Sequence, residues 1–136
     1  MTTQSITVET TVAAPVSAVW DAYITPEDIM QWNSPSDDWH TPAATVDLRE
    51  GGAFSSRMEA KDGSIGFDFA GTYTKMVEHE LIEYDFGDRH ASVEFIPEDG
   101  GVRVSVTFDP ETENPVEQQR GGWQSILDSF KRHVEP

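Results

Sequence analysis

The stretch that decides the fold is residues 114–134, which read NPVEQQRGGWQSILDSFKRHV. At about 100° per residue, its apolar side chains fall on one stripe about a third of the circumference wide. Asn114 is the expected N-cap, and Pro115 suits the first helical turn because its missing N–H would have no intrahelical partner. The pattern predicts one long helix, roughly 30 Å if it runs for twenty residues.

The inward stripe of this helix changes character along its length. It is apolar from Trp123 onward, but Gln119 and Arg120 precede that residue on the same stripe. Since a helix that only fills a core needs no such polar start, we expect a cavity with polar groups near one end. Arg120 is a candidate to hold a ligand carboxylate through two parallel hydrogen bonds. The alternative is that this helix end projects past the sheet and both side chains reach water.

Two adjacent glycines interrupt the helical pattern beside these polar residues. Gly121 and Gly122 each cost roughly 1 kcal/mol relative to alanine in a helix interior. Gly122 is expected to allow a close approach to the sheet or to the first helices, whereas Gly121 lies on the outer face without a packing reason. We expect a local kink or a loosely held first turn there, and the corresponding hypothesis is that this segment gates the cavity.

The region before this helix alternates apolar and polar residues over more than sixty positions. The alternation predicts six strands at residues 43–48, 54–58, 65–73, 80–86, 91–95 and 102–108. Short turns rich in glycine and acidic residues separate them. Consecutive strands joined in this way predict an antiparallel meander.

The N-terminal part contributes one more strand and two short helices. Residues 5–12 alternate as a strand, and Pro15 opens a helix with apolar residues at helical spacing. Thr25 and Pro26 start a second short helix, and residues 33–42 form a polar loop. The chain therefore reads as one α+β domain over residues 1–136. We expect a curved antiparallel sheet of six or seven strands wrapped around the long C-terminal helix.

Four groups of residues resemble a known family. They are Thr25-x-Glu27-x-Ile29-x-x-Trp32, Asp47-Leu48-Arg49-x-Gly51-Gly52, Gly71-Thr72-Tyr73 and Gly122-Trp123-x-x-x-Leu127. This combination resembles the homologues of the activator of the heat-shock-protein-90 ATPase, within the START-like or SRPBCC superfamily. The resemblance implies the helix-grip fold of the birch-pollen-allergen type. That superfamily includes lipid carriers, polyketide cyclases and hormone receptors, and most members have no fixed catalytic motif to carry over.

The composition excludes several classes of partner. The formal net charge is −16, with 25 acidic and 9 basic side chains, so nucleic acids and anionic membrane surfaces are poor partners. There are no cysteines and therefore no disulfide framework. Because the chain shows neither a signal peptide nor an apolar run of membrane-spanning length, we expect a cytoplasmic protein without membrane insertion.

Aromatic side chains are the main candidates for a binding site. Strand parity and helical spacing place several of them toward one interior, where they would line a pocket for a planar or apolar ligand; the alternative is an ordinary core. The predicted ligand-binding residues are Trp32, Trp39, Met58, Phe67, Phe69, Tyr84, Phe86, Gln119, Arg120 and Trp123. Trp32 and Trp39 flank the polar loop and would form a lid, or else would cap the edge of the core.

No catalytic, cofactor or metal motif is recognisable. The loop carries Asp37, Asp38 and His40, but it has no second histidine, so no metal site is expected. We expect no cofactor, because phosphate-binding and dinucleotide-binding patterns are absent from the sequence.

Three functions remain open at this point. The leading one is binding of a small hydrophobic or aromatic ligand between the long helix and the sheet. The second is a co-chaperone-like interaction with a protein partner, a heat-shock-protein-90 type ATPase. The third is a cyclase-like or aromatase-like enzyme in which Tyr84 or Arg120 polarises a carbonyl. Either a monomer or a homodimer is compatible with the sequence.

Overall fold

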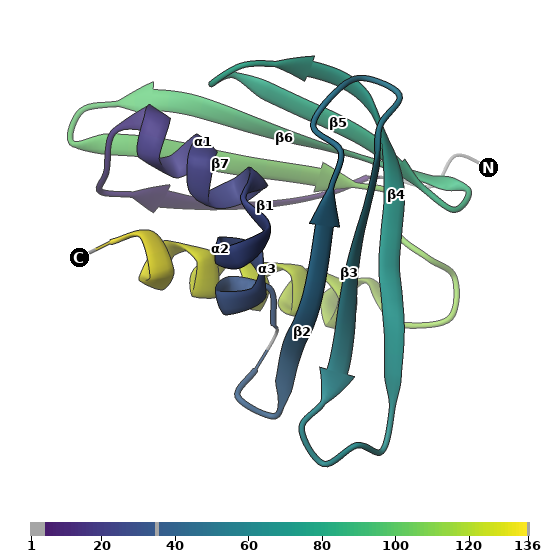
Figure 1. The fold of residues 1–136 in the computed structure, drawn as a ribbon. Helices are drawn as coiled ribbons and strands as arrows, with labels where there is room; N and C mark the ends of the chain where they lie inside the picture. The colour runs from purple at the N-terminus through teal and green to yellow at the C-terminus, as the bar shows by residue number, and fades with distance from the viewer. Residues whose placement is uncertain (1–4, 35, 136) are drawn as a thin grey trace.

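The computed structural model describes residues 5–34 and 36–135, which form a curved antiparallel sheet wrapped around the C-terminal helix α3 (Val116–Val134) (Figure 1). The helices α1 (Val16–Ile24) and α2 (Pro26–Trp32) lie in the connection between the first two strands. The strands are β1 (Ile6–Val12), β2 (Trp39–Val46), β3 (Ala53–Ala60), β4 (Gly66–Val77), β5 (Leu81–Phe86), β6 (Arg89–Glu98) and β7 (Gly101–Phe108). The α+β helix-grip fold predicted from the sequence is confirmed.

The sheet order is β1-β7-β6-β5-β4-β3-β2, so six strands form a meander and β1 closes its far end. Ile6 pairs with Phe108 and Val12 pairs with Val102 in antiparallel register. All four side chains are buried, because the period-two alternation puts them on the concave face toward α3.

Strand β2 begins at Trp39, four residues before the predicted start at residue 43. Trp39 and His40 already pair with β3, and the register then shifts between His40 and Ala43. Pro42 lies inside this shift. A proline cannot donate to a strand ladder but is tolerated at a bulge on an edge strand. The proline-containing loop expected at residues 33–42 is therefore partly strand.

Helix α3 begins at Val116, and its N-cap is Pro115 rather than the expected Asn114. Pro115 has extended backbone angles, φ −58° and ψ 146°, so the helix cannot include it. The side-chain amide of Asn114 instead donates to the carboxylate of Glu111. The helix then continues unbroken through both glycines to Val134. No helix in the described parts of the chain is long and apolar enough to cross a bilayer.

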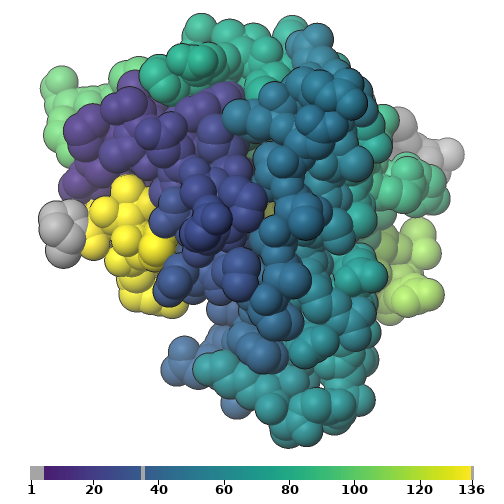
Figure 2. Space-filling view, viewed as in Figure 1, coloured from purple at the N-terminus to yellow at the C-terminus, as the bar shows by residue number. Residues whose placement is uncertain are grey.

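The second half of α3 is packed against α1 and α2. The ring of Phe130, which is 0% exposed, lies edge-on to Tyr23 and Trp32, at centroid distances of 5.2 and 5.0 Å. The indole Nε1 of Trp32 donates to the carbonyl of Ala22 at 2.9 Å and so ties α2 to α1. In the space-filling view the α1–α2 segment and β2 lie side by side across the front, and the yellow end of α3 emerges beside them (Figure 2).

Helix α3 also lies along the free edge of β1, the edge that does not pair with β7. Three of its polar side chains donate hydrogen bonds to alternate backbone carbonyls of that strand. The pairs are Arg120 to Thr7 at 3.3 Å, Gln124 to Glu9 at 3.0 Å and Lys131 to Thr11 at 2.7 Å. These bonds fix the rotation of the helix about its own axis, and they therefore decide which of its residues face the concave side of the sheet.

Candidate ligand-binding cavity

A cavity of about 460 Å³ lies between the first half of α3 and the concave face of the sheet. Its volume is within the usual range of small-molecule sites, roughly 300–1,000 Å³. The helix contributes Gln119, Gly122, Trp123, Ile126 and Leu127 to the lining, and the side chains of β3, β4 and β5 form the opposite wall. Gln119 and Trp123, the residues between which the sequence analysis expected a site, both border this space.

The aromatic wall of the cavity is built from rings that fix one another. The Phe69 ring lies edge-on to Tyr84, Phe86 and Trp123, with centroids 6.3, 5.5 and 6.1 Å apart. Behind the wall, the indole of Trp123 stacks on Phe108 at 3.9 Å, with the rings only 9° from parallel. Edge-to-face and stacked pairs of this kind hold their partners in place. The wall is thus preorganised.

Two glycines shape the cavity in opposite ways. A Cβ atom at Gly71 on β4 would lie 2.8 Å from Cζ of Phe54 and 2.3 Å from the carbonyl oxygen of Asp85, so only glycine allows this packing. A Cβ atom at Gly122 on α3 would meet nothing within 4 Å. The expected close approach at Gly122 is therefore wrong. The missing side chain instead leaves part of the cavity open.

Seven of the ten predicted ligand-binding residues line the cavity: Trp32, Met58, Phe67, Phe69, Tyr84, Gln119 and Trp123. Trp39, Phe86 and Arg120 do not. Trp39 lies at the margin of the sheet, with its ring edge-on to Phe67 at 6.0 Å. Phe86 is buried behind the wall, with its centroid 5.8 Å from that of Trp123.

The buried side chain of Gln119 uses its amide to hold the segment before the helix. Its Oε1 accepts a hydrogen bond from the backbone N–H of Glu111 at 2.8 Å. Its Nε2 donates to the carbonyls of Glu111 and Asn114, at 3.1 and 2.8 Å. Gln119 therefore forms part of the cavity wall, but its hydrogen-bonding groups are committed to residues 111–114.

Arg120 is on the flank of α3 rather than on its cavity side, which corrects the expectation from the helical stripe. Its guanidinium donates to the carbonyl of Thr7 and lies 3.4 Å from the carboxylate of Glu117. The physical reason is angular: Arg120 is turned by about 100° from Gln119 around the helix axis. Because Gln119 faces the cavity, that turn brings Arg120 to β1.

Arg89, the first residue of β6, is the cationic side chain that the sequence interpretation missed. It lines the cavity, and its guanidinium carbon lies 4.4 Å from the centroid of the Phe86 ring. Its Nε is buried and has no hydrogen-bond partner. Strand parity carried the signal, because Arg89 shares its face with Ala91, Val93 and Phe95.

The tyrosine hydroxyl groups near the cavity are neutral at physiological pH. Burial raises the pKa of Tyr73 to about 12, and it also raises the pKa of Tyr23 and Tyr84 well above the usual value of 10.0. The positive charge of Arg89 acts in the opposite direction on the pKa of Tyr84, but burial outweighs it. These phenols can donate hydrogen bonds, but they cannot act as bases near neutral pH.

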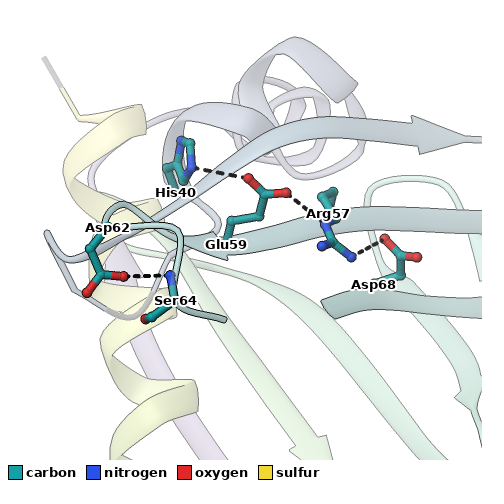
Figure 3. Close-up of polar contacts among 6 residues, drawn as sticks. All are labelled: His40, Arg57, Glu59, Asp62, Ser64 and Asp68. Carbon is teal, nitrogen blue, oxygen red and sulfur yellow. Dashed lines mark hydrogen bonds and ion pairs between the residues drawn. The ribbon is translucent and has the colours of Figure 1, made fainter. Parts of the chain in front are cut away.

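The remaining charged groups of this part of the sheet lie on its outer face. Figure 3 shows Arg57 between Glu59 and Asp68, with nitrogen–oxygen distances of 2.9 and 3.5 Å. His40 lies 3.7 Å from Glu59 rather than beside an aspartate of the loop. Across residues 5–34 and 36–135, no group of three or more histidine or acidic side chains is placed to hold a metal ion.

Comparisons with known proteins place the chain in a family. Residues 13–135 match the family model described as "Activator of Hsp90 ATPase homolog 1-like protein". The search of curated proteins returned no match.

Three solved structures share the fold over nearly their whole length. The AHSA1-like protein from Aeromonas hydrophila is 45% identical with a TM-score of 0.90, over 96% of this chain and 92% of that one. Chr148 from Cytophaga hutchinsonii is 46% identical with a TM-score of 0.83, over 94% and 90%. CV1439 from Chromobacterium violaceum is 26% identical with a TM-score of 0.84, over 98% and 99%. The chain therefore belongs to the Activator of Hsp90 ATPase homolog 1-like family.

Proposed function

We propose that this protein binds a small hydrophobic or aromatic ligand in the cavity between α3 and the sheet. The observation that carries the proposal is an apolar space of about 460 Å³ bounded by Phe69, Tyr84 and Trp123. Each Å² of apolar surface that a ligand buries there contributes about 25 cal/mol. Because the rings already hold one another, little side-chain freedom would be lost on binding.

The two adjacent glycines of α3 allow a matched test. A Cβ atom added at Gly121 or at Gly122 would meet no other atom within 4 Å, but only Gly122 lines the cavity. Gly122→Leu should fill part of the space and weaken binding of an aromatic probe such as 2-naphthaleneethanol at least tenfold. Gly121→Leu should bind the probe as the unmodified protein does.

The readout is the indole N–H signal of each tryptophan in nuclear magnetic resonance spectra during the titration. The Trp123 signal should shift, whereas Trp20, which is buried against Phe95 and does not line the cavity, should not. Equal probe affinity in the two leucine variants, or probe-induced shifts confined to tryptophans outside the cavity, would contradict the proposal.

A second candidate is the co-chaperone-like role that the family description suggests. The formal net charge of −16 favours a partner surface that is basic. Its test is the ATPase rate of a purified heat-shock-protein-90 type ATPase with and without this protein. A rate that rises equally with the unmodified protein and with Gly122→Leu would support an interaction that does not use the cavity.

The cyclase-like alternative retains Tyr84 at the cavity but not Arg120, whose guanidinium is held at β1. Ligand binding therefore has the stronger geometric support.

A further inference from the structure

The cavity contains a cationic side chain that the described protein does not neutralise. In the described residues two buried side-chain nitrogens have no hydrogen-bond partner, the Nε atoms of Arg89 and Arg103. The guanidinium of Arg103 lies 3.4 Å from the carboxylate of Glu98, so its charge is compensated. Arg89 forms no ion pair within 4 Å in the parts of the chain that are described.

The position of Arg89 is fixed from behind by an aromatic ring. Arg89 faces Phe86 across the β5–β6 turn, and its guanidinium carbon lies 4.4 Å from the centroid of that ring. This cation–π contact orients the planar group but accepts none of its N–H hydrogens in a conventional hydrogen bond. The Nε atom itself is buried, so the terminal Nη nitrogens, which make no hydrogen bond within the described residues, are the groups that a molecule in the cavity can reach.

Two neighbouring polar side chains at this end of the cavity hold the segment before α3 rather than Arg89. Glu111 also lines the cavity, but its Oε1 accepts hydrogen bonds from the backbone and side-chain nitrogens of Asn114. The amide of Gln119 is committed to the same segment. Since no carboxylate of the described residues lies within 4 Å of the Arg89 guanidinium, a molecule in the cavity is free to pair with it.

We propose that the ligand is amphipathic, with an aromatic or apolar body against Phe69 and Trp123 and a carboxylate paired with Arg89. This inference rests on the proposed function. A carboxylate fits because its two oxygens match two adjacent N–H groups of a guanidinium, and because leaving a buried charged donor unpaired is costly. The protein's net negative charge opposes anions at long range, so the pair must act at short range inside the cavity.

The test compares two probes that share one ring system, 2-naphthylacetic acid and 2-naphthaleneethanol. The unmodified protein should bind the acid about 10- to 100-fold more tightly, because a charge-assisted hydrogen bond is worth about 1.5–3 kcal/mol. Arg89→Met keeps the apolar stem of the side chain and removes the charge, so it should lose this preference. Its affinity for the alcohol should change less than about threefold, which also shows that the variant is folded.

Arg120→Met is the matched control, because Arg120 is the nearby arginine of α3 that does not line the cavity. It should retain the preference for the acid. Equal affinity of the unmodified protein for acid and alcohol would overturn the inference and leave the proposed function intact. A preference for the acid that survives in Arg89→Met would overturn it as well. Failure of both probes to bind the unmodified protein would reject both proposals together.

Discussion

The two halves of α3 face the same sheet but have different surroundings. In the second half, Phe130 is completely buried between the rings of Tyr23 and Trp32. In the first half, Gly122 faces open space, and the cavity beside it is lined by residues of the sheet and by Glu111 and Asn114 of the segment before the helix. The apolar stripe of a helix therefore does not by itself decide whether its face is packed or open. Whether the face is packed or open depends on the elements that lie opposite the stripe and on the absence of a side chain at Gly122.

The largest expected effect is at the packed half. Phe130→Ala should lower the free energy of unfolding by about 3–5 kcal/mol, because the removed ring leaves a cavity lined by side chains that cannot follow it. Phe67→Ala is the control at the open half, where the ring is already 45% exposed. Its loss should be below about 1.5 kcal/mol. Chemical denaturation of both variants measures the difference, and equal losses would remove the distinction between the two halves.

A smaller effect is expected for the hydrogen bonds that join Gln119 of α3 to residues 111–114. Gln119→Ala removes three hydrogen bonds that the buried amide makes with this segment. We expect the free energy of unfolding to fall by about 1–3 kcal/mol and the amide of Glu111 to exchange faster with solvent. Gln118→Ala is the neighbouring control, since that residue is exposed and its amide makes, among residues 5–34 and 36–135, a single long hydrogen bond of 3.5 Å, with Asn114. An unchanged exchange rate of the Glu111 amide in Gln119→Ala would show that these hydrogen bonds do not hold the segment before α3 in place.

The smallest effect lies on the outer face of the sheet, behind both halves. The hydrogen bond from His90 Nδ1 to Asp85, 2.7 Å long, is the main cause of a raised His90 pKa, and Glu83 at 3.0 Å adds to it. A pKa that is higher in the folded state stabilises the protein below the unfolded value, which is 6.5, and this stabilisation is lost as the pH rises through the folded value.

Because the His90 side chain is 42% exposed, this contribution should stay below about 1 kcal/mol. The measurement is the difference in unfolding free energy between the unmodified protein and His90→Gln, taken at pH 5.5 and at pH 8.5. The advantage of histidine should be present at the lower pH and absent at the higher one. An advantage that grows with pH would contradict the assigned direction of the pKa shift.

The sequence was sufficient for the fold because periodicity is a local property. Strand parity placed Phe67, Phe69 and Tyr84 on the correct face, and helical spacing did the same for Trp123. Periodicity could not show which side chains on the concave face line the cavity and which lie buried behind other rings. Phe86 has the same parity as Tyr84 but is covered by Trp123, because packing between elements decides which ring of a layer lines the space.

Arg120 and Arg89 show the same limit of periodicity: the first was wrongly placed at the cavity, and the second was missed. The helical stripe favoured Arg120, since a periodic pattern gives angles around an axis but not the direction of the neighbouring strand. The contacts with β1 set that direction and turn Arg120 away from the cavity. Arg89 could have been found from the alternation of β6, in which it shares a face with Ala91, Val93 and Phe95. It is the first residue of the strand, however, and at a strand end the alternation is the weakest guide to which face a side chain occupies.

The hydrogen bonds from α3 to β1 have a consequence for self-association. An exposed edge strand offers its backbone groups to a second chain, which is a route to aggregation. Here Arg120, Gln124 and Lys131 occupy alternate carbonyls at one edge of the sheet, and at the other edge β2 carries Pro42 within its register shift. The two edges are thus blunted by different means. Copies of this protein that meet should therefore do so through side-chain surfaces rather than by extending the sheet from one molecule to the next.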